Sequence, residues 1–329
     1  MKIAIVILNW NGKALLKQFL PSVIKYSEDN DIYLVDNAST DDSVSYTKEY
    51  FPQIKIIQNL ENGGYAKGYN DALQDVDADV FCLLNSDVEV TKNWLSPIIE
   101  VFKNDTNTAI IQPKLLDYNR RDYFEYAGAA GGFIDKFGYP YCRGRIFNTI
   151  EKDSEQYNDT TQIFWASGAC LFIRKDTFKY LKGFDESFFA HMEEIDLCWR
   201  ARNLGLNVTY VGTSSVYHVG GATLSNANPK KTFLNFRNSL FTLVKNAYGN
   251  IFFLVFNRLL LDGVAGIKFI LEFKPNHTLA IIKAHFSFYK HLPILLKQRK
   301  KLNQESKYYT ITSIVWSYFT LHKKHFNSL

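Results

Sequence analysis

The stretch VFCLLNSD, residues 80–87, decides the predicted fold, because an apolar run ends directly in a polar triplet. The apolar part is too short for a helix and is bounded by polar residues, which is typical of a fully buried β-strand. Asp87, after Asn85 and Ser86, would lie past the carboxyl end of this strand, where open α/β sheets bind their ligands. A carboxylate there can hold a divalent cation against a diphosphate, because hard cations such as Mg²⁺ prefer oxygen ligands. A simple turn is the alternative, since Asn, Ser and Asp all favour turns.

Strands and helices alternate around this stretch over the first 90 residues. The predicted strands are 3–8, 32–35, 55–58 and 80–84, and the predicted helices between them are 13–26, 43–51 and 65–74. Strands separated by single helices imply parallel pairing, so the sequence predicts an α/β fold with a doubly wound, mostly parallel sheet.

The pattern is less regular after residue 91. We expect loops and short strands over 114–160, a strand over 164–174, a helix over 193–203, and strands over 208–211 and 215–218. Helical spacing returns from about residue 232 to about residue 298. This pattern divides the chain into an α/β unit, residues 1–230, and a helical C-terminal region, residues 231–329.

Charge separates the same two regions. Residues 230–329 contain 16 Lys and Arg against 3 Asp and Glu, whereas residues 1–229 contain 22 against 30. The basic, aromatic-rich helices end in the run KQRKK, residues 297–301, and are typical of an element that binds an anionic membrane surface. Helices that pack on the α/β unit with their lysines in water are the alternative. We expect no nucleic acid partner, because no recognised binding motif is present.

Bulk composition favours a folded protein of a reducing compartment. Hydrophobic residues make up 47% of the 329 residues and charged residues 22%, which excludes a disordered chain. The four cysteines lie far apart without Cys-x-x-Cys spacing, as expected of buried thiols in the cytoplasm. The apolar run after Lys2 is too short for a signal peptide, and no stretch of 18 uncharged apolar residues predicts a membrane span.

Two further features of the first half can bind a nucleotide. Asp36 follows a predicted strand as Asp87 does, and its carboxylate can accept hydrogen bonds from a base edge or a ribose hydroxyl; capping of the next helix is the alternative. The glycine-rich segment 62–68 precedes a helix, a position suited to phosphate, and contains Gly64 and Lys67. It matches neither the dinucleotide fingerprint nor the P-loop, so a solvated Lys67 is equally compatible with the sequence.

A dense acidic block lies at residues 191–200, HMEEIDLCWR. Adjacent carboxylates beside aromatic residues tend to have a raised pKa, which suits a general base, so Glu193, Glu194 and Asp196 are candidate catalytic residues. The alternative is stabilisation of acids in a first helical turn, with Asp196 and Arg200 as an i,i+4 ion pair. His218 ends a later predicted strand and is a candidate metal ligand or a packed histidine.

Eight short sequence blocks follow one another in a recognisable order. NWNG, VDNASTDDS, NGGYAKGYN, LLNSD, WASGACLFIRKD, GFDESFF, MEEIDLCWRAR and HVGG follow one another over about residues 3–245, and this order resembles family 2 glycosyltransferases. It is most similar to their bacterial rhamnosyltransferase-like branch. The resemblance implies a GT-A fold, in which a nucleotide-sugar-binding sheet is fused to an acceptor-binding half. It also implies inverting sugar transfer by a single in-line displacement at the anomeric carbon.

The resemblance implies a role for each matching residue. Asp36 would read the nucleobase, with Asn9, Asn11 and Asn37 in the same pocket, and Gly64 and Lys67 would lie near the donor. Asp87 would be the acid of the DxD-type motif, holding Mg²⁺ or Mn²⁺ on the diphosphate with Asn85 and Ser86 beside it. The remaining implied roles are a base at Glu194, acceptor positioning at Glu193, a further metal ligand at His218, and a border of the sugar and acceptor at Trp165 and Gly168.

Two positions depart from the family pattern. Asn85 stands where the motif usually begins with Asp, which leaves one strong carboxylate for the metal. Glu194 stands where Asp is commoner, and a displacement of about 1 Å can cost on the order of 10²-fold in rate. Asp196 is therefore the fallback base.

We expect the donor to be a nucleotide sugar such as dTDP-rhamnose or a UDP-hexose, and the acceptor a hydroxyl of a glycan or of a lipid-linked sugar. The setting would be cell-surface polysaccharide synthesis, in the cytoplasm or at the inner face of its membrane. One alternative is a sugar-phosphate nucleotidyltransferase, which needs a Gly-rich, Arg-bearing loop where this chain has NWNG. The other is a catalytically silent carbohydrate- or membrane-binding protein on the same fold.

Overall fold

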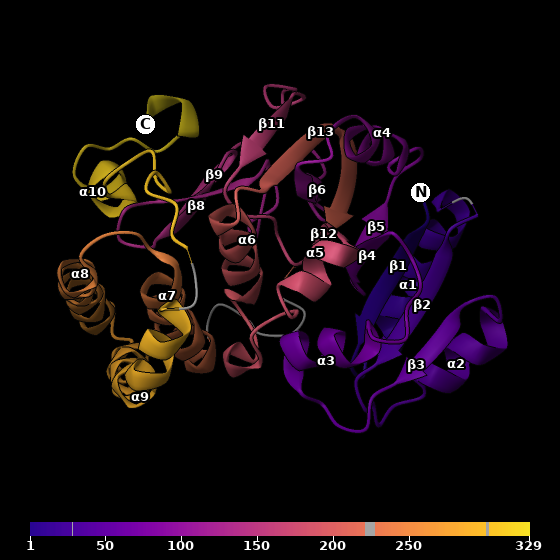
Figure 1. Cartoon of the computed structure of the whole chain (residues 1–329), viewed down its shortest axis with the longest axis horizontal. Coiled ribbons are helices and arrows are strands. Elements are labelled where there is room, and N and C mark those ends of the chain that lie inside the picture. The colour runs from indigo at the N-terminus through magenta and orange to yellow at the C-terminus, as the bar shows by residue number, and fades with distance from the viewer. Residues whose placement is uncertain (28, 221–227, 301–302) are drawn as a thin grey trace.

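Figure 1 shows the computed structural model, which describes residues 1–27, 29–220, 228–300 and 303–329. A mixed nine-stranded sheet forms the centre, with its strands in the order β11-β13-β6-β12-β4-β1-β2-β3 and β5 paired to β13. Gly221 of the HVGG block and Lys301 of the terminal basic run lie outside the described residues.

The first half of the chain forms the parallel part of the sheet, as predicted. Its strands are β1 (Ile3–Asn9), β2 (Asp31–Asp36), β3 (Lys55–Gln58) and β4 (Val80–Asn85), and the helices α1 (Lys13–Tyr26), α2 (Ser43–Tyr50) and α3 (Gly64–Ala72) alternate with them. β1 pairs in parallel with β2 and with β4, so that Asn9 lies opposite Asp36 and Leu8 opposite Asn85. The carboxyl ends of the three strands therefore meet at one edge.

The second half extends the sheet beyond β4 with both antiparallel and parallel strands. Its elements are β5 (Val88–Val90), α4 (Ser96–Asn104), β6 (Thr108–Asp117), β11 (Thr160–Ile163), β12 (Cys170–Arg174), α5 (Lys175–Tyr180) and β13 (Asn207–His218). β12 runs antiparallel between β4 and β6, and β13 is parallel to β6. His218, at the end of β13, therefore lies close to Asp87: the next residue, Val219, donates its backbone N–H to the carbonyl of Asp87 at 3.1 Å.

Three predictions for this half were wrong. The strand predicted over 164–174 begins only at Cys170, as β12, because the chain leaves the sheet after β11 ends at Ile163 and residues 164–169 form no strand. The strands over 208–211 and 215–218 are one strand, β13, with a register shift between Val211 and Ser215. The ten-residue β6 was not predicted, because Pro113 and Lys114 interrupt its apolar pattern and a proline argues against a central strand.

A second, smaller sheet covers one side of this half. It contains β7 (Gly132–Ile134), β8 (Pro140–Cys142), β9 (Arg145–Ile146) and β10 (Thr149–Ile150), all antiparallel. These elements confirm the short strands expected within 114–160. A 3₁₀ turn, η1 (Glu186–Phe188), then leads to α6 (Glu193–Asn203), whose bounds match the prediction.

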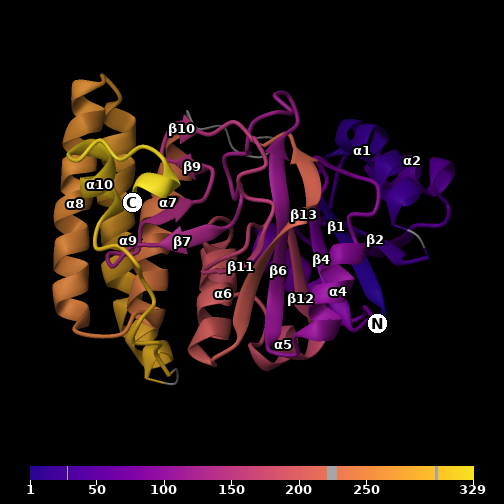
Figure 2. The same cartoon turned by 90° about the horizontal axis from the view of Figure 1, so that it is seen from above.

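The C-terminal region is helical, as predicted. Its elements are α7 (Pro229–Asn246), α8 (Ile251–Leu271), α9 (Pro275–Arg299), α10 (Ile314–Phe319) and the 3₁₀ turn η2 (Phe326–Ser328). Figure 2 shows α8 and α9 on the outer flank, away from the nine-stranded sheet. Among the described residues, no helix combines the length and the apolar character needed to cross a membrane.

Buried polar contacts join this region to the rest of the protein. Asp262 of α8 is completely buried and accepts hydrogen bonds from Arg258 Nε at 2.8 Å and from Tyr139 Oη, before β8, at 2.7 Å. His285 Nε2 of α9 lies 3.2 Å from the other oxygen of Asp262. Because a buried ion pair is costly to break, this cluster fixes α8 and α9 against the α/β unit. The boundary at residue 230 remains a prediction.

Candidate active site

The ends of β1 and β2 are joined by a network of side-chain hydrogen bonds. Asn9 Nδ2 donates to Asp36 Oδ1 at 3.2 Å and to Ser43 Oγ at 3.0 Å, and Asp36 Oδ2 accepts from the backbone N–H of Ser39 at 3.1 Å. Asn9 and Asp36 are buried, and Asn9 Oδ1 has no hydrogen-bond partner. Asp36 therefore shapes the loop after β2, and the free amide oxygen of Asn9 is open to a donor group.

Two further asparagines tie neighbouring loops to this network. Asn11 has a left-handed backbone (φ 51°), and its Oδ1 accepts from the backbone N–H groups of Thr40, at 2.7 Å, and Asp41, at 3.2 Å. Asn37 Nδ2 donates to the carbonyl of Gly64 at 3.1 Å. The loops after β1, β2 and β3, in which the sequence predicted nucleotide-binding residues, are thus brought together.

Asp87 and His218 form the centre of the next cluster. Both side chains are buried, and His218 Nε2 lies 3.1 Å from Asp87 Oδ1 while its Nδ1 lies 3.3 Å from Glu125 Oε1. Asn85 Nδ2 is 3.5 Å from His218 Nε2, and Ser86 is partly exposed beside them. The sequence analysis missed Glu125, since nothing in its local sequence marks a residue that a distant strand brings to His218.

Burial and the neighbouring charged groups shift the pKa values of His218 and Asp87. Burial alone would lower the pKa of His218, but the charge of Glu125 and the hydrogen bond to Asp87 raise it to about 10. Burial likewise acts to raise the pKa of Asp87, and the hydrogen bond and charge of His218 outweigh it, so the pKa is lowered. An ionised Asp87 is what a cation site requires.

The donor set fits a divalent cation that takes its other ligands from a substrate. Asp87 offers a carboxylate oxygen, and His218 would offer an imidazole nitrogen once a cation displaces the proton that its raised pKa retains; Mg²⁺ and Mn²⁺ accept such groups. No set of three or more histidine, cysteine or acidic side chains within the described residues is arranged to hold an ion by itself. Oxygens of a diphosphate would therefore have to complete the shell.

The glycine-rich segment packs against the acidic block. Gly64 has φ +80°, and a Cβ there would lie 2.5 Å from the carbonyl oxygen of Phe189, which accepts from the backbone N–H of Tyr65 at 3.0 Å. This close approach accounts for the glycine at position 64, so no phosphate ligand is needed to explain it. Lys67 forms an ion pair with Asp71 at 2.7 Å on the partly exposed side of α3. Its ammonium group therefore already has a partner.

Glu193 and Glu194 are carboxyls with raised pKa values. Burial, then the charge of Glu194, raises the pKa of Glu193 well above its usual value. Burial raises the pKa of Glu194 to about 7, against the opposing effect of nearby backbone N–H groups. Oε2 of each side chain has no hydrogen-bond partner. Near neutral pH this pair can hold one proton and accept another.

A strained turn precedes the two acids. Phe189, His191 and Met192 all have φ between 64° and 73°, a left-handed conformation that costs roughly 1 kcal/mol or more per residue. The buried Asn238 of α7 holds this turn, because its Nδ2 donates to the carbonyls of Phe188 (3.1 Å), Ala190 (2.9 Å) and His191 (2.7 Å). α7 therefore positions Glu193 and Glu194, a role that no local signal at residue 238 predicts.

Two predicted site residues have packing partners instead. The carboxylate of Asp196 is completely buried and contacts Arg200 Nε at 2.8 Å, Asn246 Nδ2 at 2.8 Å and Lys245 Nζ at 2.9 Å. Trp165 is buried, and its indole N–H donates to the carbonyl of Phe133 at 2.9 Å. These contacts favour structural roles, in line with the alternative of an Asp196–Arg200 ion pair.

The segment Gly168–Ala169 contacts residues close to both acidic clusters. The carbonyl of Ala169 accepts from the backbone N–H of Asn85 at 3.0 Å, and the carbonyl of Gly168 accepts from Tyr65 Oη at 2.9 Å. Burial and the neighbouring Tyr69, followed by the charges of Glu193 and Glu194, raise the pKa of Tyr65 well above its usual value. Asn85 of the Asp87 cluster and Tyr65, which lies near the charges of Glu193 and Glu194, thus both contact one short segment.

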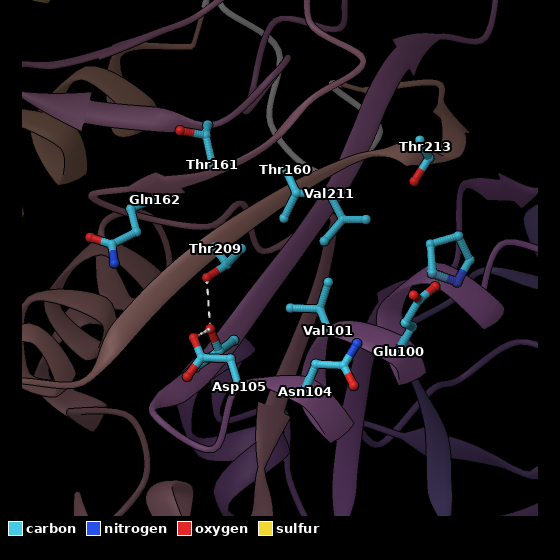
Figure 3. Close-up of a pocket in the computed structure, with 12 residues that line it drawn as sticks. Glu100, Val101, Asn104, Asp105, Thr160, Thr161, Gln162, Thr209, Val211 and Thr213 are labelled. Atoms are coloured by element: carbon cyan, nitrogen blue, oxygen red, sulfur yellow. Dashed lines mark hydrogen bonds between the residues drawn. The ribbon is translucent and has the colours of Figure 1, made fainter.

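A groove elsewhere contains none of these residues. It has a volume of about 440 Å³ and lies between α4, β11 and β13, where Thr209 and Thr108 form a hydrogen bond of 2.9 Å (Figure 3). Thr209 is near the amino end of β13, whereas His218 ends the same strand. The groove is therefore separate from the acidic clusters.

Comparison with known proteins identifies the family. The family model of glycosyl transferase family 2 matches residues 4–181, more than half of the chain. The chain belongs to glycosyl transferase family 2. This finding confirms the resemblance drawn from the sequence blocks.

Relatives of this glycosyltransferase family member are named as a hexosyltransferase and a rhamnosyltransferase. A low-salt glycan biosynthesis hexosyltransferase of Haloferax volcanii is 25% identical over 211 residues, which cover 63% of this chain and 63% of that protein. N-acetylglucosaminyl-diphospho-decaprenol L-rhamnosyltransferase of Mycobacterium tuberculosis is 24% identical over 222 residues, which cover 62% and 71%. The matched part thus spans less than two thirds of the first relative.

Solved structures confirm the GT-A fold. GalNAc-T7 with UDP, GalNAc and Mn²⁺ matches 75% of this chain and 48% of its own, with a TM-score of 0.59 and 17% identity. The mannosyltransferase of Pyrobaculum calidifontis with GDP-Man and Mn²⁺ matches 91% and 84%, with a TM-score of 0.54 and 12% identity.

We expect Asn238→Ala to lower the kcat of sugar transfer by roughly 10- to 100-fold with little change in KM, because the turn before Glu194 would shift. The pH at which the rate is half-maximal should shift as well, since the surroundings of Glu194 change. Steady-state kinetics across pH test this, with Asn257→Ala as the control: Asn257 Nδ2 donates to the carbonyl of Phe253 in α8 in the same manner. Equal effects of the two substitutions would contradict a positioning role.

Glu194→Gln should change the pH dependence of stability. The pKa of Glu194 rises from its usual 4.5 to about 7 on folding, so the wild type loses stability as pH increases through this window. Glutamine cannot ionise, so the free energy of unfolding of the variant, relative to that of the wild type, should increase by roughly 2 kcal/mol from pH 5 to pH 8. Urea denaturation at both pH values measures this, with the exposed Glu186→Gln as control. A difference independent of pH would contradict the raised pKa.

Proposed function

We propose that this protein is a metal-dependent, inverting hexosyltransferase. It transfers a sugar from a nucleotide-diphosphate donor, such as dTDP-rhamnose or a UDP-hexose, to a hydroxyl of a glycan or lipid-linked acceptor. The observation that carries the proposal is that the segment Gly168–Ala169 contacts both Asn85, which lies beside His218, and Tyr65, whose pKa the charges of Glu193 and Glu194 help to raise. A donor diphosphate at Asp87 and His218 would then place its anomeric carbon toward Glu193 and Glu194.

Glu194 acts as the general base in this proposal. A sugar hydroxyl is a poor nucleophile, and a positioned base that takes its proton during attack contributes about 10²- to 10⁴-fold. A pKa of about 7 keeps a large fraction of Glu194 ionised at neutral pH without making it a weak base. Attack from this side in a single displacement inverts the anomeric carbon and needs no covalent enzyme intermediate.

Glu193 orients the acceptor. Burial and the charge of Glu194 raise the pKa of Glu193, which favours the protonated form, and in that form its Oε2, which has no partner, can donate a hydrogen bond to an acceptor hydroxyl. One proton on Glu193 also removes the repulsion that two adjacent buried carboxylates would exert. The two glutamates therefore take different roles through different pKa values.

Asp87 and His218 would hold Mg²⁺ or Mn²⁺, and such an ion supplies a Lewis acid for the charge on the leaving diphosphate. Asn9, Asn11, Asp36 and Asn37 would surround the nucleoside. The Mn²⁺ and nucleotides named with the two structural neighbours support this cofactor and donor class. With a single carboxylate in the NSD triplet, we expect modest metal affinity.

The basic C-terminal region supports a proposal for the acceptor and the location of the enzyme. We propose that the enzyme works at the inner face of the cytoplasmic membrane in cell-surface polysaccharide synthesis. The name of the mycobacterial relative includes a decaprenol-linked acceptor, which supports a lipid-linked acceptor here. The four cysteines are buried and unpaired, as expected in a reducing compartment.

Glu194→Gln should lower the transfer rate by 10²-fold or more, because the base is lost, while donor binding is retained. Consumption of nucleotide sugars in Mn²⁺ buffer, with and without acceptor, measures the rate, and thermal shift with UDP-, dTDP- and GDP-sugars measures binding. Glu186→Gln, exposed near the same turn, is the matched control.

Transfer that survives Glu194→Gln would refute the assignment of the base. Donor binding without turnover in any form of the protein would favour the silent binding protein. Release of pyrophosphate from a sugar phosphate and a nucleoside triphosphate would favour the nucleotidyltransferase.

A further inference from the structure

Helix α8 buries a charged pair and exposes apolar side chains to solvent. Arg258 and Asp262, two of its three charged residues, are buried and paired with each other, whereas large apolar side chains are exposed to solvent and the third, Lys268, lies near its carboxyl end. Every exposed residue from 251 to 267 is apolar or glycine: Phe252, Phe253, Phe256, Leu260, Gly263, Val264 and Ile267. A helix that packs on a protein in water normally shows the opposite arrangement.

The exposed apolar residues of α8 lie on one face. Steps of three and four residues separate Phe253, Phe256, Leu260, Val264 and Ile267, so they follow one stripe along the helix. Phe256 is 53% exposed and Ile267 60%. A contiguous apolar stripe of this length on a protein surface indicates an interaction site rather than chance exposure.

Helix α9 continues this face next to α8. Thr278 and His285 of α9 contact Gly266 and Asp262 of α8, and the exposed Ile282 and Tyr289 follow them by one turn. Figure 2 shows the two helices together on the outer flank of the molecule. We define the α8–α9 face by nine of the exposed apolar residues of the two helices: Phe252, Phe253, Phe256, Leu260, Val264, Ile267, Ile282, Phe286 and Tyr289.

A line of lysines borders this face. Lys283, Lys290 and Lys297 are exposed and seven residues apart, which places them on one side of α9. Lys283 directly follows Ile282, and Lys290 directly follows Tyr289. At the 3.6-residue spacing of a helix, the lysines therefore lie next to these apolar residues, on the side that faces away from α8. None of the three forms an ion pair in the part of the chain that the structure describes.

Charge decides which partner fits. Residues 230–329 carry 16 Lys and Arg against 3 Asp and Glu, so two copies of this region would repel each other. An apolar stripe bordered by unpaired lysines matches the acyl boundary and the anionic headgroups of a lipid bilayer. Since none of the described helices can span a membrane, the contact would lie in the plane of the surface.

We propose that the α8–α9 face docks on an anionic lipid bilayer, with the stripe of α8 in the headgroup–acyl boundary and the three lysines on lipid phosphates. This inference deepens the proposed function, since it names the surface on which a lipid-linked acceptor would be met. It differs from a merely basic helix, because the apolar stripe of α8 is the principal contact and the lysines are its border.

Flotation of the full-length protein with vesicles tests the proposal, using phosphatidylcholine alone and phosphatidylcholine with phosphatidylglycerol. The wild type should bind the anionic vesicles. Phe256→Gln combined with Leu260→Gln should weaken this binding by at least tenfold at every salt concentration, because buried apolar area is lost. Lys283→Gln, Lys290→Gln and Lys297→Gln together should weaken it by about 100-fold at low salt, and salt should have less effect on what remains.

Leu60→Gln is the matched control, because Leu60 is fully exposed in the α/β unit and lies outside the α8–α9 face. It should leave vesicle binding unchanged. Donor binding by thermal shift, measured on the same samples, separates this proposal from the proposed function, since the α8 and α9 variants should keep it. Absence of vesicle binding by the wild type, or unchanged binding by the α8 variant, would overturn the proposal. A dimer in solution that the α8 variant dissociates, without vesicle binding, would assign the face to a second copy and also overturn it.

Discussion

The parallel pairing of β1 with both β2 and β4 is the constraint on which the candidate site depends. In this register Asn9 lies opposite Asp36 and Leu8 opposite Asn85, so three strand ends deliver polar side chains to one edge. A slip of one residue would turn the side chains of a strand to its other face and separate these groups. The buried apolar residues of the strands fix the register, and the packing of the core therefore determines the geometry of the site.

A second constraint is the cost of keeping Glu193 buried and Glu194 half-buried. Their unpartnered oxygens and raised pKa values are unfavourable for folding, and so is the left-handed turn before them. Contacts from α7 offset this cost, because Asn238 holds the carbonyls of the turn and Lys245 pairs with Asp185 and Asp196. The first helix of the basic C-terminal region thus supports the chemistry of the α/β unit.

The sequence predicted the elements that short apolar runs and polar boundaries define. β1 to β4, α1 and α6 agree with it to within a residue or two, and their end residues come together as expected. It could not predict β6, where Pro113 hides a central strand, or the contacts of Glu125 and Asn238, which depend on chain segments far apart in sequence. Nor could it show that α8 buries Arg258 and exposes Phe256, because periodicity reveals two faces of a helix without saying which one is covered.

The position of a bound metal ion tests the central claim most directly: acids from distant parts of the chain share one diphosphate site. Anomalous diffraction from crystals grown with Mn²⁺ and a nucleoside diphosphate would locate the ion. The account predicts a Mn²⁺ peak about 2 Å from the Asp87 carboxylate, with the diphosphate between it and Glu194. A nucleotide bound in the groove between α4, β11 and β13, or Mn²⁺ remote from Asp87, would contradict it.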